Sequence, residues 1–259
     1  MEPLIIIATP NICWLDPDVE YPKTPQAIAE EAYHCEINGA TIFHTHGEGR
    51  WAETIHAVRE SSSIIIQCGM SSLRIADRME VFEQKADMIS IILNHHDEAF
   101  ARTECLELHS REELLQYASL CQKYNVKPEF EVWHTGSIWN LNYLISKGVL
   151  ESPYVATLFF GWPGGTWSPP TIEEYLYRRK LMPTGSVINV SIMGQEQIDI
   201  VTSAIIMGDH VRVGTEDYPL DRTGVVSPTH ILVKEVAEIA RSIGRPVATV
   251  EQARNIIGV

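Results

Sequence analysis

Positive charge is scarce in this sequence. Its 259 residues include 20 lysines and arginines against 34 aspartates and glutamates, which gives a formal charge of −14. Nucleic acids and anionic membrane surfaces are bound through clustered Lys and Arg side chains, so the composition argues against both kinds of partner. A small anionic substrate held by a few local arginines remains compatible with this charge.

Cysteine and long apolar runs are also scarce. The cysteines are odd in number, scattered and without CxxC spacing: Cys13, Cys35, Cys68, Cys105 and Cys121. They indicate neither a disulfide framework nor a cysteine-based zinc site, and a reducing cytoplasm fits them best. The apolar start of the chain is too short for a signal peptide or a membrane span, and no basic residue precedes it.

What the chain does contain is a regular alternation of short apolar runs with longer amphipathic ones. Strands are expected at 4–9, 40–46, 63–68, 88–93, 127–133, 154–160, 186–192 and 210–215. Helices are expected at 25–38, 51–60, 73–84, 110–124, 137–147, 171–181, 195–207, 228–243 and 250–257. Eight strands, each followed by a helix, predict an α/β fold, a (β/α)₈ TIM barrel forming a single domain over residues 1–259. The glycine fingerprint of a doubly wound sheet is missing after the first strand.

The stretch from Ala40 to Gly49 attracts attention because an apolar run ends in His44 and His46. Residues two apart on a strand share one face, so both imidazoles are expected to project together where the strand opens into a loop. Two such histidines are ligands for a divalent metal, most often zinc. A structural histidine pair is the alternative, because His-x-His alone is a weak signal.

In a TIM barrel the catalytic groups lie at the carboxyl ends of the strands. The last strand ends in Arg212, Gly214 and Glu216, which alternation places on one face, and it adjoins the first strand. Glu216 is therefore expected to reach the histidines and complete a three-ligand zinc site with an open position. Asp217 is the expected general base, with Arg212 lowering its pKa.

Less specific interpretations of these residues stay open. Glu216 could be a salt-bridged surface residue, and Asp217 a cap or loop acid. Arg212 could instead be a structural partner of Glu129 or Glu131.

Other strand ends supply the expected substrate contacts, namely Asn11, Gly69, Ser72, Asn94, His95 and Glu131. His95 and His96 are adjacent, so at most one points inward, and substrate contact is favoured over a metal bond. Glu131 could equally be in a structural pair. Trp162 and Trp167, with the glycines between them, indicate a lid more than a phosphate cradle, because no P-loop lysine follows.

Several motifs together resemble the β-keto acid cleavage enzymes, whose founding activity is 3-keto-5-aminohexanoate cleavage. They are Met1–Ile5, Thr24–Ala32, His44-Thr45-His46, Lys127–Val132, His210–Asp217 and Gly244–Thr249 with Ala253-Arg254. The resemblance implies a zinc-bearing TIM barrel, usually oligomeric and here expected to be a homotetramer. It implies that His44, His46 and Glu216 hold zinc and that Asp217 is the base, supported by Arg212.

The implied reaction is cleavage of a β-keto acid with acetyl-CoA, which gives acetoacetate and the CoA thioester of the remaining acyl group. The pocket departs from the family pattern: Gly47-Glu48-Gly49 replaces Val-Arg-Asp, and Gly69-Met70-Ser71-Ser72 replaces Ser-Thr-Gly-Gly. A different β-keto acid or a drifted reaction is therefore expected. The alternatives are a metal-dependent aldolase or hydrolase of a small oxo acid without CoA, and a non-catalytic metal or metabolite binder.

Overall fold

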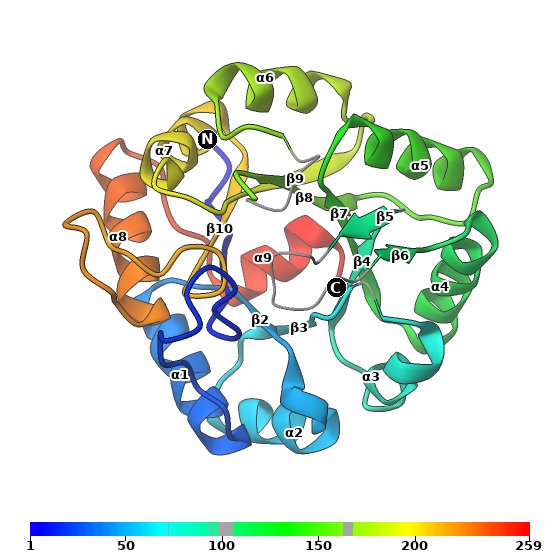
Figure 1. Cartoon of the computed structure of the whole chain (residues 1–259), viewed down its shortest axis with the longest axis horizontal. Helices are drawn as coiled ribbons and strands as arrows, with labels where there is room; N and C mark the ends of the chain where they lie inside the picture. Colours follow the sequence, from blue (N-terminus) through cyan, green and yellow to red (C-terminus); the bar gives the residue numbers. More distant parts are fainter. Residues whose placement is uncertain (72, 94, 98–105, 163–167) are drawn as a thin grey trace.

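Eight parallel strands close into a barrel in the computed structural model of the chain (Figure 1). The strands are β1 (Ile6–Ala8), β2 (Ile42–Thr45), β3 (Ile65–Cys68), β4 (Met88–Ile92), β7 (Lys127–Val132), β8 (Tyr154–Phe160), β9 (Ser186–Ile192) and β10 (His210–Val213). Their order around the barrel is β1-β10-β9-β8-β7-β4-β3-β2, so the last strand pairs with the first. The predicted TIM barrel is confirmed.

The structure describes residues 1–71, 73–93, 95–97, 106–162 and 168–259. Of Glu48, His95–Asp97 and Leu106–Leu108 only the backbone is described.

Helices surround the barrel. They are α1 (Pro25–Asn38), α2 (Trp51–Ser61), α3 (Met79–Glu83), α4 (Arg111–Tyr124), α5 (Thr135–Ser146), α6 (Ile172–Leu181), α7 (Gln197–Met207), α8 (Thr229–Ser242) and α9 (Val250–Ile257). Of these, α1, α2 and α9 begin at the residues that the sequence predicts, and all the others except α3 begin within two residues of the prediction. Thr24 and Ser110 cap α1 and α4, because their hydroxyls accept hydrogen bonds from the Ala27 and Glu113 amides. Asn38 ends α1 as expected, and Gly39 adopts the left-handed conformation that terminates it.

The first three strands are shorter than expected; the first, predicted at 4–9, covers Ile6–Ala8. Three other segments also differ. The helix predicted over 73–84 is a 3₁₀ turn, η2 (Ile75–Arg78), followed by the short α3. The last strand ends at Val213 instead of Thr215, because a turn begins at Gly214. A two-stranded antiparallel hairpin, β5 (His95–Asp97) with β6 (Leu106–Leu108), lies between β4 and α4 and was not predicted.

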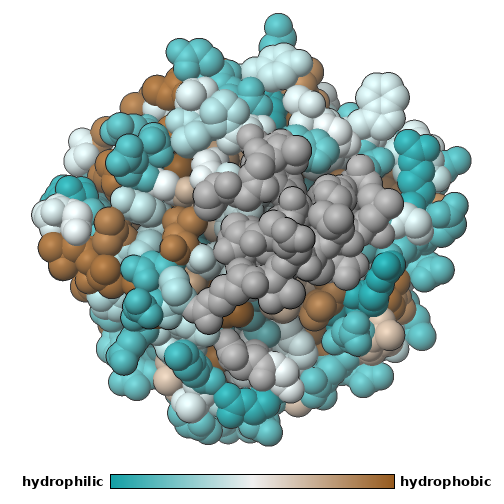
Figure 2. All heavy atoms as spheres, viewed as in Figure 1, coloured by the Kyte–Doolittle hydropathy of each residue, from teal (hydrophilic) through white to brown (hydrophobic). Residues whose placement is uncertain are grey.

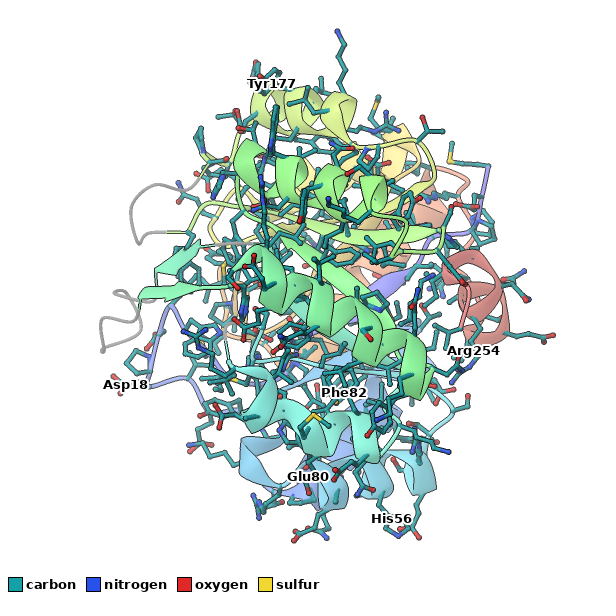
Figure 3. The ribbon with its side chains drawn as sticks, turned by 90° about the vertical axis from the view of Figure 1, so that its right-hand side faces the viewer. Asp18, His56, Glu80, Phe82, Tyr177 and Arg254 are labelled. Atoms are coloured by element: carbon teal, nitrogen blue, oxygen red, sulfur yellow. The ribbon has the colours of Figure 1, made fainter. Side chains whose placement is uncertain are left out.

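The interior of the barrel is layered. At the amino-terminal ends of the strands, inward-facing apolar side chains such as Ile5, Ile42 and Met88 pack against Ala253 and Ile257 of α9. Figure 3 shows α9, beside Arg254, at one end of the molecule and the β5–β6 hairpin at the other. This apolar layer, which we call the apolar floor, closes the amino-terminal end of the barrel. The buried polar side chains lie above it, toward the carboxyl ends of the strands.

Buried polar residues form the next layer up: Gln67, Ser90, Glu129, Thr157 and Asn189. Gln67, Ser90 and Thr157 each lie two residues after an apolar floor residue of the same strand, so they point inward as well. Glu129 pairs with Ser90, and Asn189 pairs with Thr157, on neighbouring strands. Burial, with the charge of Glu131 nearby, raises the pKa of Glu129 to about 8, so this carboxyl group is mostly neutral at pH 7.

The outer surface is mixed in character. Figure 2 shows apolar side chains at the edge of one face over the β10–α8 connection, where Val225 and Val226 are more than half exposed. None of the helices in the described ranges combines the length and apolar character needed to cross a membrane.

His210 joins the two strands that close the barrel. It is buried, and its Nδ1 accepts a hydrogen bond from the Ile5 amide at 3.0 Å. Burial and the neighbouring Arg245 lower the pKa of His210 from 6.5 to about 3, while Glu2 lies 3.5 Å from Nε2. The unfolded chain therefore takes up this proton first, and the contribution to stability is lost as the pH falls from about 6.5 toward 3.

We expect the free energy of unfolding to fall by about 2 kcal/mol between pH 7 and pH 5 on account of His210 alone. His210→Asn keeps an acceptor for the Ile5 amide and removes the titrating group. Urea unfolding at both pH values should show a smaller pH dependence for the variant by about that amount. An equal pH dependence in both proteins would contradict this assignment.

Candidate metal and substrate site

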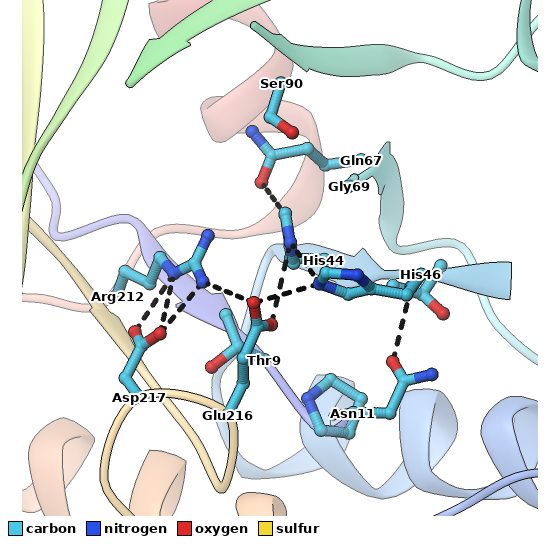
Figure 4. Close-up of polar contacts among 12 residues, drawn as sticks. Thr9, Asn11, His44, His46, Gln67, Gly69, Ser90, Arg212, Glu216 and Asp217 are labelled. Carbon is cyan, nitrogen blue, oxygen red and sulfur yellow. Dashed lines mark hydrogen bonds and ion pairs between the residues drawn. The ribbon is translucent and has the colours of Figure 1, made fainter. Parts of the chain in front are cut away.

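Two histidines enter the site from the carboxyl end of β2. His44 belongs to the strand and His46 follows it directly, and both side chains are buried. Their Nε2 atoms lie 3.3 Å apart (Figure 4). The strand parity expected from the sequence therefore brings both imidazoles to the same point.

Glu216 reaches the histidines through a turn and not through strand alternation. Gly214 follows β10 with φ +156°, and any side chain there would collide with the Thr9 carbonyl oxygen. This close approach lets the Glu216 amide donate to that same oxygen at 3.1 Å. Glu216 lies beside His44 and His46, as the sequence predicts. The predicted cause, alternation along the strand, is wrong because the strand ends three residues before Glu216.

The three side chains have the spacing of ligands around one ion. His46 Nε2 lies 2.9 Å from Glu216 Oε1, and His44 Nε2 lies 3.6 Å from Glu216 Oε2. Ligands at 2.0–2.1 Å from a tetrahedral zinc ion are about 3.3 Å from each other. Within the described ranges, His44, His46 and Glu216 are the one group of three such residues close enough to hold a metal.

The hydrogen bonds of His44 leave Nε2 available as a ligand. His44 Nδ1 is 2.9 Å from Gln67 Oε1, so the amide oxygen accepts and Nδ1 carries the proton. Burial, together with the charge of Arg212, holds the pKa of His44 well below its ordinary value. The imidazole is therefore neutral, with its Nε2 lone pair directed at the other two residues.

The carboxylate of Glu216 also fits a metal. Its Oε1 is 3.0 Å from Arg212 Nη2 and 3.4 Å from Trp14 Nε1, whereas its buried Oε2 has no hydrogen-bond partner among the described residues. Burial alone would raise the pKa of Glu216, but His46 and Arg212 outweigh it and hold that pKa well below its usual range. An ionised oxygen without a donor is what a cation would satisfy.

Arg212 lies between Glu216 and Asp217 (Figure 4). Its Nη2 and Nε donate to the two Asp217 oxygens at 2.8 and 3.0 Å, and Ser191 Oγ donates to the same carboxylate at 2.8 Å. Burial raises the pKa of Asp217 above its ordinary value although Arg212 opposes this. The expected net lowering is therefore wrong, because Asp217 is fully buried.

Arg212 makes ion pairs with Glu216 and Asp217. The alternative, in which its main partner is Glu129 or Glu131, does not agree with these contacts. Two buried carboxylates share one buried guanidinium, and each would be costly without it.

A cavity opens beside the metal ligands, lined also by Arg212, Glu131 and several aromatic side chains. Of the six expected substrate contacts, Glu131 lines this cavity, and Gly69 lies against the histidines. Asn11 accepts a hydrogen bond from the His46 amide at 3.4 Å, so it positions the ligand loop. Ser72 and Asn94 lie outside the described residues, as does the side chain of His95.

The predicted lid residue Trp162 is buried and lines the cavity, whereas Trp167 is outside the described ranges. Sequence reasoning missed Trp14, Gln67, Trp133 and Phe159, which contact site residues or line the cavity. Gln67 had a usable signal, because it is a polar residue in an otherwise apolar strand. The aromatic residues had none, since aromatic side chains in apolar runs are mostly core.

Comparison with known proteins shows which family this sequence matches. A family model described as beta-keto acid cleavage enzyme matches residues 3–259. A 3-keto-5-aminohexanoate cleavage enzyme from Acetoanaerobium sticklandii is 30% identical, and the alignment covers 100% of this chain and 99% of that protein. A 3-oxoadipate:acetyl-CoA acetyltransferase from Cupriavidus necator is 24% identical over 92% of this chain and 89% of its own.

Among solved structures, the apo structure of ObcA superposes with a TM-score of 0.71 at 15% identity. The match covers 92% of this chain and 65% of that one, so this chain spans just under two thirds of its length. At this identity the likeness concerns the fold.

Gly69 tests the geometry of the ligand group. A Cβ at this position would lie 2.6 Å from His44 Nε2 and 3.0 Å from His46 Nε2. Gly69→Ala should therefore push the two ring nitrogens apart and weaken zinc binding by about 10- to 100-fold, with the barrel still folded. Zinc titration against a competing chelator and circular dichroism measure the two effects.

Gly194→Ala is the matched control, because the added methyl there meets only the flexible Glu196 side chain. Zinc affinity should be unchanged in the control. Unaltered zinc affinity in Gly69→Ala would show that the ion, if bound, sits elsewhere.

Proposed function

Because the chain belongs to the beta-keto acid cleavage enzyme family, we propose that it is a zinc-dependent enzyme that cleaves a β-keto acid with acetyl-CoA. In the balanced reaction, R–CO–CH₂–COO⁻ and acetyl-CoA give acetoacetate and R–CO–CoA. The observation that carries the proposal is the convergence of His44, His46 and Glu216 beside a cavity that Arg212 also lines.

Zinc suits the donor set better than other common ions. Two imidazole nitrogens and one carboxylate form a usual catalytic zinc site, with a position left for a reactant. When bound, zinc would act as a Lewis acid that polarises the carbonyl group of the β-keto acid. Magnesium and calcium prefer sets made of oxygen donors, which the histidines do not provide.

The chain's own residues account for orientation and charge. Gln67 fixes the ring of His44, and Asn11 holds the His46 backbone, so both ligands are pre-organised. Arg212 presents a guanidinium to the cavity beside the ligand Glu216. It would stabilise the negative charge of a substrate carboxylate or of a developing enolate.

We assign proton transfer to Asp217. It would take a proton from the carbon between the carboxylate and the ketone, and this carbon then attacks the thioester carbonyl of acetyl-CoA and releases the thiolate. Attack of the thiolate on the ketone carbon breaks the bond between that carbon and the deprotonated one, gives the new thioester and releases the enolate of acetoacetate. Asp217 then returns its proton to this enolate, which completes acetoacetate. A raised pKa makes Asp217 a stronger base than an ordinary aspartate, which supports this role.

The acetyl-CoA part of the proposal is supported by the name of the Cupriavidus relative, an acetyl-CoA acetyltransferase. We further propose a cytoplasmic homo-oligomer, on the family resemblance and on the four described cysteines, all free and buried.

Acetyl-CoA dependence tests the reaction. Zinc-loaded protein offered a panel of β-keto acids should consume acetyl-CoA and release an equal amount of acetoacetate for at least one of them. The thioester product is identified by mass spectrometry. Equally fast carbon–carbon cleavage without any thioester would overturn the proposal and favour an aldolase or hydrolase.

Asp217→Asn tests the base. The variant keeps the shape of the side chain and one oxygen that can accept from Arg212, while its NH₂ group can donate to Ser191 Oγ. The measured zinc content and melting temperature show how much of any loss is structural. We expect kcat to fall between about 100- and 10,000-fold, with bound zinc near one per chain and KM for the β-keto acid little altered. Asp18→Asn, at an exposed loop position, is the control and should keep full activity.

Loss of zinc from Asp217→Asn would mean that the residue supports the metal. Retention of most of the activity would leave it as an anchor for Arg212 only.

A further inference from the structure

The cavity has an aromatic wall that the reaction as such does not require. Trp133, Phe159, Trp162 and Met193, which we call the aromatic wall, form a buried apolar cluster and line the cavity together. They come from the carboxyl ends of three consecutive barrel strands, β7, β8 and β9. The wall therefore lies where the part of a substrate beyond the reacting carbons would be placed.

Both faces of the Phe159 ring in this wall are already occupied. Trp133 and Phe159 are stacked, with centroids 4.2 Å apart and an interplanar angle of 11°. The Arg212 guanidinium carbon lies 4.9 Å over the Phe159 ring, and two groups this close cannot share one face. Phe159 thus has the indole on one face and a cation on the other. A cage for a cationic ligand needs free ring faces, which this ring does not offer.

Glu131 is the one carboxylate of the cavity lining that neither belongs to the metal group nor pairs with a described cation. It is buried, and its Oε2 accepts a hydrogen bond from Trp133 Nε1 at 3.0 Å. Glu131 therefore fixes the orientation of the Trp133 ring.

Charged tails meet unfavourable surroundings here. An anionic tail would lie near Glu131, and Arg212 is the only Lys or Arg in the described cavity lining and is already paired with two carboxylates. A cationic tail would lie near Arg212 and the zinc that we propose, and Glu131, which already accepts from Trp133, would be the one carboxylate left to offset both positive neighbours. Burying either charge without a dedicated partner is costly, whereas an apolar group gains from the wall.

We propose that the acyl group transferred to CoA is uncharged and apolar, and that it is a flat aromatic or similarly hydrophobic group resting on the aromatic wall. This inference rests on the proposed function, since it names the substrate class of the same site. The wall is then the specificity determinant, while the metal group and Arg212 bind the β-keto acid portion common to all such substrates.

Four β-keto acids that differ only beyond the ketone test the class. The zinc-loaded protein is offered 3-oxo-3-phenylpropanoate, 3-oxohexanoate, 3-oxoadipate and 3-oxo-4-(trimethylammonio)butanoate with acetyl-CoA. We expect kcat/KM for the phenyl acid to exceed that for both charged acids by about 100-fold, with the aliphatic acid in between. A charged acid that matches or exceeds the phenyl acid would overturn the inference.

Binding without acetyl-CoA separates this inference from the proposed function. Each acid is titrated against the tryptophan fluorescence of the zinc-loaded protein, and the phenyl acid should bind at least about 30-fold more tightly than the charged ones. If this order holds but no acid yields acetoacetate, the reaction is wrong and the substrate class stands. If acetoacetate forms but all four acids bind equally, the substrate class is wrong and the reaction stands.

Met193→Ala tests the wall directly. Met193 is 3% exposed and lines the cavity, so its truncation should weaken binding of the phenyl acid by about 10-fold and leave the charged acids unchanged. Met193→Leu keeps an apolar side chain of similar size and should restore binding to within about 3-fold.

Met207→Ala is the matched control, because Met207 is 44% exposed on α7, outside the cavity. It should bind all four acids like the wild type, and melting temperatures show that each variant is folded. Equal losses for all four acids in Met193→Ala would show that the residue supports the site in general and not the apolar tail.

Discussion

The shared pairing of Arg212 with Glu216 and Asp217 is the interaction on which the site depends. All three side chains are buried, and the two carboxylates are neighbours in sequence. Without the guanidinium they would repel each other in a medium of low dielectric constant. With it, one carboxylate can remain ionised toward the histidines while the other is held apart from them. One strand-end cation thus separates a ligand from a candidate base that is only one residue away.

The fold was predictable because its signals are periodic and local. The apolar runs gave the barrel strands almost to the residue at β8 and β9, and hydroxyl caps such as Thr24 gave helix starts. The β5–β6 hairpin was not predicted, since it departs from the βα repeat that organises the rest of the chain. The interrupted segment before β4 was missed because its apolar spacing also suits a single helix.

The site was predictable only in part. Strand parity brings His44 and His46 together, and strand order brings Glu216 to them, although through a turn that depends on Gly214. The pKa of Asp217 could not be foreseen, because it depends on complete burial and not on the neighbouring arginine alone. Nor could the wall formed around Trp133, since its side chains come from separate strands and meet only when the barrel closes.

The floor built on α9 has a consequence for how such a protein can diversify. The apolar layer that α9 covers lies at the amino-terminal ends of the strands, whereas the metal group lies beyond their carboxyl ends, and the layer shares no residue with the cavity. Stability and selectivity are therefore encoded by different ends of the same strands. Substitutions in the cavity can therefore change which substrate binds, while the apolar layer at the other end continues to stabilise the barrel. Related barrels can in this way acquire new substrates and keep one architecture.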